Sequence, residues 1–212
     1  MPVKPLSCLL FLAVVTVSCS SGKTSSPAAA PTSRPPAATG CGPKATTAPG
    51  ATAAGDAAVS GDIPDTQAYV TYPAADGYRI DVPEGWGRSQ SGTTVAFTDK
   101  FNAIRVEVVP AVVAPTVAEA TAREVGALAV VAPCFQAGQV SQVTRKAGSA
   151  ILITFKADSA QDPVTGKIVR LDVERYEFWR SGKEAVVTLS SPTGSDNVDP
   201  WKRVTDSFAW SA

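Results

Sequence analysis

The sequence predicts an α+β domain, an antiparallel β-sheet covered by helices, which follows a long disordered tether. Short segments of alternating apolar and polar residues recur from about residue 68 onward, which is typical of half-buried strands. Two segments whose apolar residues have helical spacing interrupt these strands. The 43 residues before the strands, residues 20–62, include almost no large apolar side chain and therefore cannot bury a core.

The first residues have the pattern of a secretory signal peptide. Lys4 precedes an apolar run, residues 6–17, which is too short to span the roughly 30 Å core of a bilayer. The run ends in Thr-Val-Ser-Cys at positions 16–19, which resembles the lipobox of bacterial lipoproteins, although Thr16 stands where leucine is usual. The resemblance implies a diacylated Cys19 as the mature N-terminus, on the extracytoplasmic face of the cell membrane. The alternative is an ordinary secretory signal that ends near a cysteine.

The composition of the next segment predicts a tether. Of the 43 residues at 20–62, 36 are Ala, Gly, Pro, Ser or Thr, which is typical of disordered segments. As a flexible coil, a segment of this length would span roughly 35–40 Å. The sequence therefore divides into a signal peptide (1–18), a lipidated cysteine with its disordered tether (19–62) and one folded domain (63–212).

The charge of the domain excludes several function classes. It carries 15 Lys and Arg residues and 17 Asp and Glu residues, a net charge of −2, which argues against nucleic-acid binding. Membrane attachment must then come from the lipid on Cys19. The chain contains no histidine, which excludes Ser-His-Asp and Cys-His catalysis and every histidine metal site. The sequence predicts neither a metal nor a cofactor.

The cysteines suggest one disulfide. Cys8 lies in the predicted signal peptide and Cys19 would be lipidated, which leaves Cys41 and Cys134. A disulfide between these two is plausible in an oxidising compartment and would pin the middle of the tether to the domain. The alternative is a loose Cys41 and a buried free thiol at Cys134.

Period-two alternation predicts the first strands of the domain. The segments are residues 78–82, 94–99, 102–110 and 151–156. Asp99-Lys100 is expected to form the turn between the second and third of them.

The hairpin near residue 181 shows a change of phase. Val173 belongs to one alternating set, whereas Tyr176 and Phe178 belong to the other, which predicts a β-bulge near Glu174-Arg175. Ser181-Gly182 then predicts a tight turn into a return strand at residues 185–190.

Two helices are predicted. Thr116 and Glu119 form a capping box, and Pro133 ends the first helix. Its predicted buried face is Ala118, Thr121, Ala122, Val125, Leu128 and Ala129. Asp199 is the expected N-cap of the second helix, with Pro200 at its first position. The core-facing residues of this helix are Trp201, Val204 and Phe208.

Three stretches of the domain resemble PsbP/Mog1-like domains. Residues 78–86, which end in Pro-Glu-Gly-Trp, look like their opening strand and turn, and residues 97–102 resemble their next hairpin. Residues 199–208 resemble their closing helix. The resemblance covers most of residues 69–210 and implies an α-β-α sandwich around an antiparallel sheet. Because its motifs are structural, it implies little about activity.

Several residues that carry chemistry are better explained without catalysis. Ser181 and Lys183 belong to a predicted hairpin tip, and Asp158, Asp162 and the Asp196–Asp199 region lack the ligand spacing of a calcium loop. The carboxylates that a glycoside hydrolase would need are Glu107, Glu174 and Glu177. Their alternation with apolar residues instead indicates the solvated face of a sheet.

The aromatic pair at Phe178 and Trp179 suggests a binding surface. Because neighbouring residues of a strand point to opposite faces, one of the two rings must point away from the core. Trp179 and Arg180 therefore form a candidate partner surface, since exposed Trp and Arg are common anchors of interfaces. The alternative is that a helix covers Trp179.

These observations favour a non-enzymatic, lipid-anchored envelope protein whose domain binds a protein partner, such as a transporter or an envelope assembly. The second hypothesis is a carrier of a small lipid or other apolar metabolite, which would need a cavity lined by Ile151, Leu171 or Leu189. A hydrolase that uses carboxylates is the third hypothesis, and it would need these groups to converge in a cleft.

Overall fold

The computed structural model describes Cys41 and residues 61–211. The predicted signal peptide, Cys19 and nearly all of the predicted tether lie outside the described residues. None of the helices within these described residues combines the length and the apolar composition of a membrane span.

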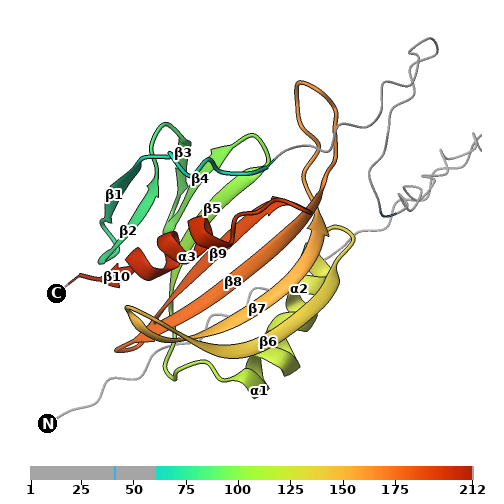
Figure 1. Cartoon of the computed structure of the whole chain (residues 1–212). Coiled ribbons are helices and arrows are strands. Elements are labelled where there is room, and N and C mark those ends of the chain that lie inside the picture. Colours follow the sequence, from blue (N-terminus) through green and yellow to red (C-terminus); the bar gives the residue numbers. More distant parts are fainter. Residues whose placement is uncertain (1–40, 42–60, 212) are drawn as a thin grey trace, which may run out of the picture. The chain divides into compact units, whose positions relative to one another are not determined.

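Antiparallel strands make up most of the domain (Figure 1). They are β1 (Tyr69–Ala74), β2 (Tyr78–Pro83), β3 (Gly87–Ser91), β4 (Thr94–Asp99), β5 (Asn102–Pro110), β6 (Gln136–Arg145), β7 (Gly148–Asp158), β8 (Arg170–Arg180), β9 (Lys183–Pro192) and β10 (Ala209–Trp210). Seven strands form one sheet in the order β3-β4-β5-β9-β8-β7-β6, and β1-β2-β10 form a smaller one. The predicted antiparallel sheet is confirmed.

The two predicted hairpin turns are also confirmed. Asp99 pairs with Asn102 in the β4–β5 hairpin, and Arg180 pairs with Lys183 in the β8–β9 hairpin. Ser181 and Gly182 both have positive φ angles, 49° and 82°, as a two-residue turn between twisted strands requires.

The predicted bulge in β8 is wrong. The pairing of β8 continues without a shift from Leu171 to Phe178 along both of its neighbours. Val173 faces one side of the sheet and Tyr176 the other, and both are buried because this part of the sheet has an apolar cluster on each side. The change of phase therefore reflects a strand buried on both faces. The register shift lies in the edge strand β6, between Ala137 and Val140.

A crossover helix, residues 117–131, carries the chain from β5 in the middle of the sheet to the edge strand β6 (Figure 1). It consists of α1 (Val117–Glu119), a π-helical turn η1 (Ala120–Glu124) and α2 (Val125–Val131). The N-cap half of the predicted capping box is confirmed, since the Glu119 N–H donates to the Thr116 hydroxyl oxygen at 3.2 Å. The hydroxyl in turn donates to the Glu119 carboxylate at 3.2 Å.

The predicted buried face of this helix is only partly correct. Ala120 is buried, and Val125 and Leu128 pack against the sheet. Four residues of the predicted face are exposed instead: Ala118, Thr121, Ala122 and Ala129. The wider π-helical turn changes the phase of the apolar stripe, which the prediction took from a regular helix.

The second helix, α3 (Val198–Ser207), begins two residues earlier than predicted, after Asn197 rather than Asp199. The Asn197 side chain does not cap the helix. Its amide group accepts from the Ile63 N–H at 2.8 Å and donates to the Gly61 carbonyl at 2.8 Å, which fixes the incoming chain. Trp201, Val204 and Phe208 are buried, as predicted.

Apolar side chains bury both faces of the large sheet. One cluster joins the sheet to β2 and α3, and includes Tyr78, Ile80, Ile104, Phe178, Leu189, Trp201 and Phe208. The other lies beneath the crossover helix and includes Ala120, Ile151, Ile153, Phe155, Ala157 and Val173. Strands make up 50% of the domain and helices only 16%. The prediction that helices cover the sheet is therefore not confirmed.

Candidate functional site

The two residues of the predicted partner surface point in different directions. Trp179 is half-buried on the face of β8 that carries Glu177, and its indole N–H donates to the Ala111 carbonyl at 2.8 Å. Arg180 is exposed on the opposite face, where its guanidinium lies 3.4 Å from the Ser211 carbonyl. The structure therefore does not bring Trp179 and Arg180 together as one patch.

Trp179 instead supports an exposed apolar loop, residues 111–116, between β5 and the crossover helix. Ala111 is held twice, because its carbonyl accepts from Trp179 and its N–H donates to the Gly182 carbonyl at 2.9 Å. The next two side chains project into solvent, with Val112 93% and Val113 65% exposed. Two exposed valines thus follow directly after a residue whose N–H and carbonyl are both bonded.

A hollow lies on each side of the 111–116 loop. The first, of 590 Å³, is bounded by the loop, the start of the crossover helix and the β6–β7 turn, with Ile151, Glu177 and Trp179 among its lining residues. The second, of 320 Å³, lies between the loop and the middle of the crossover helix. Four carboxyl groups line this second hollow: Glu119, Glu124, Glu177 and Glu184. The exposed valines of the loop therefore lie beside hollows that are lined partly by polar side chains.

Two of these carboxyl groups have perturbed acidity. Glu177 is 1% exposed and accepts from Arg175 at 3.0 Å, and Arg175 also lies 3.6 Å from Glu124. Burial raises the pKa of Glu177, and Arg175 partly offsets this effect. Burial also raises the pKa of Glu184 to about 7, and the charge of Glu177 acts in the same direction. Near neutral pH the hollow therefore carries fewer charges than carboxyl groups.

The carboxylates that the sequence offered for hydrolysis do not converge. Glu174 accepts from the Tyr176 hydroxyl at 2.8 Å on the face opposite Glu177, and Glu107 pairs with Arg105 at 2.8 Å. The neighbour of Glu177 is Glu184, which the sequence analysis missed. The register would have found it, because a two-residue turn at 181–182 sets Trp179 opposite Glu184 and Glu177 two positions further on.

The remaining candidates have structural roles. Ser181 and Lys183 are exposed at the hairpin tip. Asp162 accepts from the Thr165 N–H at 2.6 Å, which also lowers the pKa of Asp162, and Asp158 pairs with Arg170 at 3.1 Å. Among the described residues, no group of three or more Asp, Glu or Cys side chains is placed to hold a metal ion.

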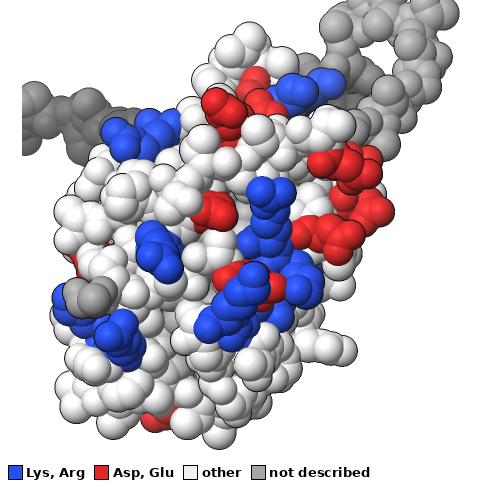
Figure 2. Space-filling model, turned by 60° about the vertical axis from the view of Figure 1, so that its left-hand side comes forward, with Lys and Arg blue, Asp and Glu red and all other residues white. Residues whose placement is uncertain are grey.

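A second charged surface lies around α3. Figure 2 shows Lys and Arg gathered near the centre of this side of the molecule, with acidic side chains among them. A hollow of 440 Å³ is lined by Asp81, Lys146, Asp199, Lys202, Arg203, Asp206 and Ser207. Asp206 binds Lys202 at 2.6 Å, which lowers the pKa of Asp206, and lies 3.9 Å from Arg145. Opposite charges therefore neutralise one another across this surface.

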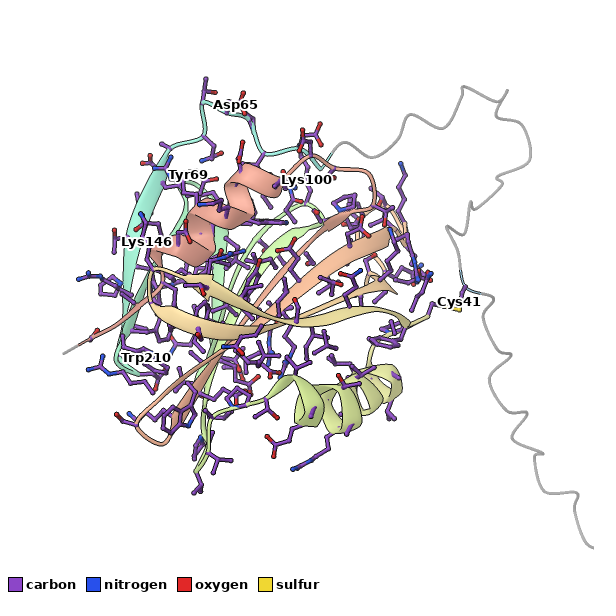
Figure 3. The ribbon with its side chains drawn as sticks, turned by 60° about the horizontal axis from the view of Figure 1, so that its bottom comes forward. Cys41, Asp65, Tyr69, Lys100, Lys146 and Trp210 are labelled. Carbon is purple, nitrogen blue, oxygen red and sulfur yellow. A yellow bond between two sulfur atoms is a disulfide. The ribbon has the colours of Figure 1, made fainter. Side chains whose placement is uncertain are left out.

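The candidate disulfide pair lies at a corner of the domain. Cys41 and Cys134 are joined by a disulfide in the turn between α2 and β6. Figure 3 shows Cys41 at one end of β6 and Lys146 at the opposite end of the molecule.

Comparisons with known proteins address the fold. The model of the PsbP family matches residues 66–193. The structure of the Ran-binding protein Mog1p from Saccharomyces cerevisiae is similar over 68% of this chain and 96% of its own, with 11% identity and a TM-score of 0.49. The structure of cyanobacterial PsbP from Synechocystis sp. PCC 6803 is similar over 67% of this chain and 92% of its own length, with 15% identity and a TM-score of 0.46.

The structure of LpqN of Mycobacterium tuberculosis is similar over 70% of this chain and 93% of its own length, with 14% identity and a TM-score of 0.43. LpqN is described as involved in cell envelope biogenesis. The search of curated proteins found no match.

Proposed function

The chain belongs to the PsbP family, and from this premise we propose that it is a non-enzymatic envelope protein whose domain binds a protein partner. Cys19 carries the lipid that holds it on the extracytoplasmic face of the cell membrane. The crossover helix and α3 pack in different apolar clusters, as Leu128 and Trp201 show, which supports the layered arrangement that the family resemblance implies. The partner is a transporter or an envelope assembly.

The exposed 111–116 loop is the observation that carries this proposal. Val112 and Val113 are among the most exposed large apolar side chains of the described residues, and the bonds at Ala111 fix the backbone from which they project. Holding Ala111 beside the two valines lowers the entropy that ordering the loop costs when a partner binds. The hollows on either side can receive side chains of the partner, and Trp179 lies at the base of one of them.

The packing of the core supports a partner rather than a carried ligand. Leu189 is fully buried and Leu171 packs against the cluster under the crossover helix, and neither is among the lining residues of the hollows of the described residues. Ile151 does reach the 590 Å³ hollow together with Trp179, which keeps the carrier as the second candidate. That hollow is also lined by Glu177 and Gln142, whose polarity suits a protein surface better than an apolar metabolite.

Site-specific crosslinking in the native host tests the proposal. A photo-reactive amino acid replaces Val112 in the full-length protein, and the matched control replaces Val164, which is 90% exposed in the β7–β8 connection. We expect a discrete protein adduct from position 112 but not from position 164, and Val113→Glu should lower the yield at position 112. The same adducts from both positions, or none from position 112, would contradict the proposal.

A native mass spectrum of the protein extracted gently from membranes separates the two candidates. A diacylglyceryl mass on Cys19 with a co-purifying protein supports the partner. A small molecule that is released from residues 63–212 would favour the carrier instead.

A further inference from the structure

A charge-free edge runs along one side of the domain. Residues 125–144 include no Asp, Glu, Lys or Arg, and they comprise α2, the disulfide turn and nearly all of the edge strand β6. Such a long uncharged stretch is unusual at an edge strand, because proteins commonly protect strand edges with charge. In β6 the register shift between Ala137 and Val140 interrupts the edge instead, which disfavours pairing with another strand.

The outer side of α2 is apolar. Val125 and Leu128 turn inward to the sheet, whereas Val130 is 85% and Val131 is 74% exposed. The other exposed residues of this side are Gly126, Ala127, Ala129 and Pro133. We call these six exposed residues the α2 face.

The disulfide sets where the predicted tether leaves the domain. Cys41 is bonded to Cys134, which directly follows the α2 face. The chain that leads back to Cys19 therefore departs from this corner rather than from residue 61. It has 21 residues, 20–40, and its composition predicts a coil of roughly 25 Å. Without the disulfide, the same path would have 41 residues, 20–60.

We propose that the α2 face is the surface by which the domain rests on the lipid bilayer, with Val130 and Val131 entering the headgroup region. This inference depends on the lipid at Cys19, which is part of the proposed function. Two exposed valines bind a bilayer too weakly to hold a free protein, as even one acyl chain binds only reversibly. A short tether to a lipid anchor, however, keeps the α2 face close to the bilayer. The high effective concentration then populates even a weak contact between them.

The geometry gives this contact a consequence for the partner surface. The crossover helix has the α2 face at its end and the 111–116 loop at its start. Its 15 residues span about 22 Å at 1.5 Å per residue. The length of the helix therefore separates Val112 and Val113 from the lipid contact, so that the two contacts use different residues.

Crosslinking in vesicles tests the inference. The full-length lipidated protein is placed in vesicles of equimolar phosphatidylcholine and phosphatidylglycerol, with a photo-reactive amino acid at position 130. The matched control has it at position 198, where Val198 is 71% exposed at the start of α3. We expect phospholipid adducts at position 130 to exceed those at position 198 by roughly tenfold, as a tether strongly favours one oriented contact.

A second variant tests the role of the disulfide. Cys41→Ser lengthens the path to the anchor, so lipid adducts at position 130 should fall by roughly threefold as the effective concentration decreases. Equal adducts at positions 130 and 198 in protein that floats with the vesicles would overturn the inference while leaving the anchor intact. Adducts at position 130 to a second copy of the chain would overturn it as well. Failure to float would refute the lipid anchor itself, and the inference with it.

Discussion

Glu184 lies opposite Trp179 across the β8–β9 hairpin, and its raised pKa gives a first prediction. The folded-state pKa of about 7 lies above the ordinary value of 4.5, so between these pH values the folded protein retains a proton that the unfolded chain has lost. The contribution of Glu184 to stability therefore decreases as the pH rises through this window. Glu184→Gln should match the wild type below pH 4.5 and resist urea better above pH 7.

The matched control for this experiment is Glu84→Gln, which changes an exposed glutamate at the end of β2. Its urea midpoint should follow the wild type at every pH. If Glu184→Gln also follows the wild type at every pH, the carboxyl group of Glu184 is not desolvated in the folded protein.

The buried pair of Arg175 and Glu177 gives the second prediction. Arg175→Met leaves the carboxylate of Glu177, which is 1% exposed, without its charged partner, and the free energy of unfolding should fall by about 3 kcal/mol. The double variant Arg175→Met with Glu177→Leu should recover most of this loss, because no unpaired charge stays buried. Chemical denaturation measures both, and a double variant as unstable as the single one would refute the explanation.

Residue-scale features could be predicted from the sequence wherever they depend on local spacing. Alternation along β8 requires that Trp179 and Arg180 point to opposite faces, so even the sequence argued against a single patch. The support that Trp179 gives to Ala111 spans 68 residues, and no local pattern encodes such a contact. The environment of Glu177 likewise depends on Glu124 from the crossover helix.

At the scale of elements, two glycines form a matched pair for the third prediction. A Cβ added at Gly138, next to the register shift of β6, would lie 2.6 Å from the Thr154 carbonyl oxygen, a backbone atom that cannot move aside. Gly138→Ala should therefore destabilise the domain by about 1–3 kcal/mol. At Gly126 in α2, an added Cβ meets no atom of the described residues within 4 Å, so Gly126→Ala should stabilise by about 1 kcal/mol.

Thermal and chemical unfolding of the two variants measure whether the free energy of unfolding decreases in Gly138→Ala and increases in Gly126→Ala. Equal effects of Gly138→Ala and Gly126→Ala would show that the irregular pairing of β6 does not require glycine. The presence of Gly138 in an otherwise strand-like segment was a signal for a bulge, and the sequence analysis placed the bulge in β8 instead.

Element boundaries were predictable where a local motif sets them. The Thr116 N-cap and the Ser181-Gly182 turn depend only on neighbouring residues, and both lie where the sequence placed them. The apolar phase of the crossover helix could not be predicted, because the π-helical turn depends on how the helix meets the sheet. For the same reason, Asn197 replaced Asp199 before α3, where the amide group of Asn197 binds the distant residues Gly61 and Ile63.

At the scale of the whole molecule, the order of the strands follows from the crossover. β5 and β9 pair although the crossover helix and three strands separate them in the sequence. Alternation predicts which residues are buried in each strand, but it does not say which strands become neighbours or where the edge lies. The charge-free stretch at residues 125–144 was therefore visible in the sequence, whereas its position along an edge beside the disulfide required the structure.

The separation of the two surfaces gives the last prediction. The 111–116 loop precedes the crossover helix, and Val130 lies near the end of this helix, about 20 Å along it from Val117. Substitutions at such distances act independently. Val112→Glu should lower protein adducts from a probe at position 113 by roughly tenfold, since it places an unpaired charge in an apolar contact worth about 1.4 kcal/mol or more. Lipid adducts from a probe at position 131 should be unchanged. Val130→Glu should lower the lipid adducts from a probe at position 131 and leave the protein adducts from a probe at position 113 unchanged.

Both valines are exposed, so neither substitution disturbs the core, and unchanged urea midpoints serve as the control. Crosslinking yields in native membranes measure the two contacts side by side. If Val130→Glu also removes the protein adducts at position 113, the partner binds only a domain that already rests on the bilayer, and lipid contact is then a condition for recognition. Loss of lipid adducts in Val112→Glu would instead show that the 111–116 loop itself touches the membrane, and the proposed orientation would be wrong.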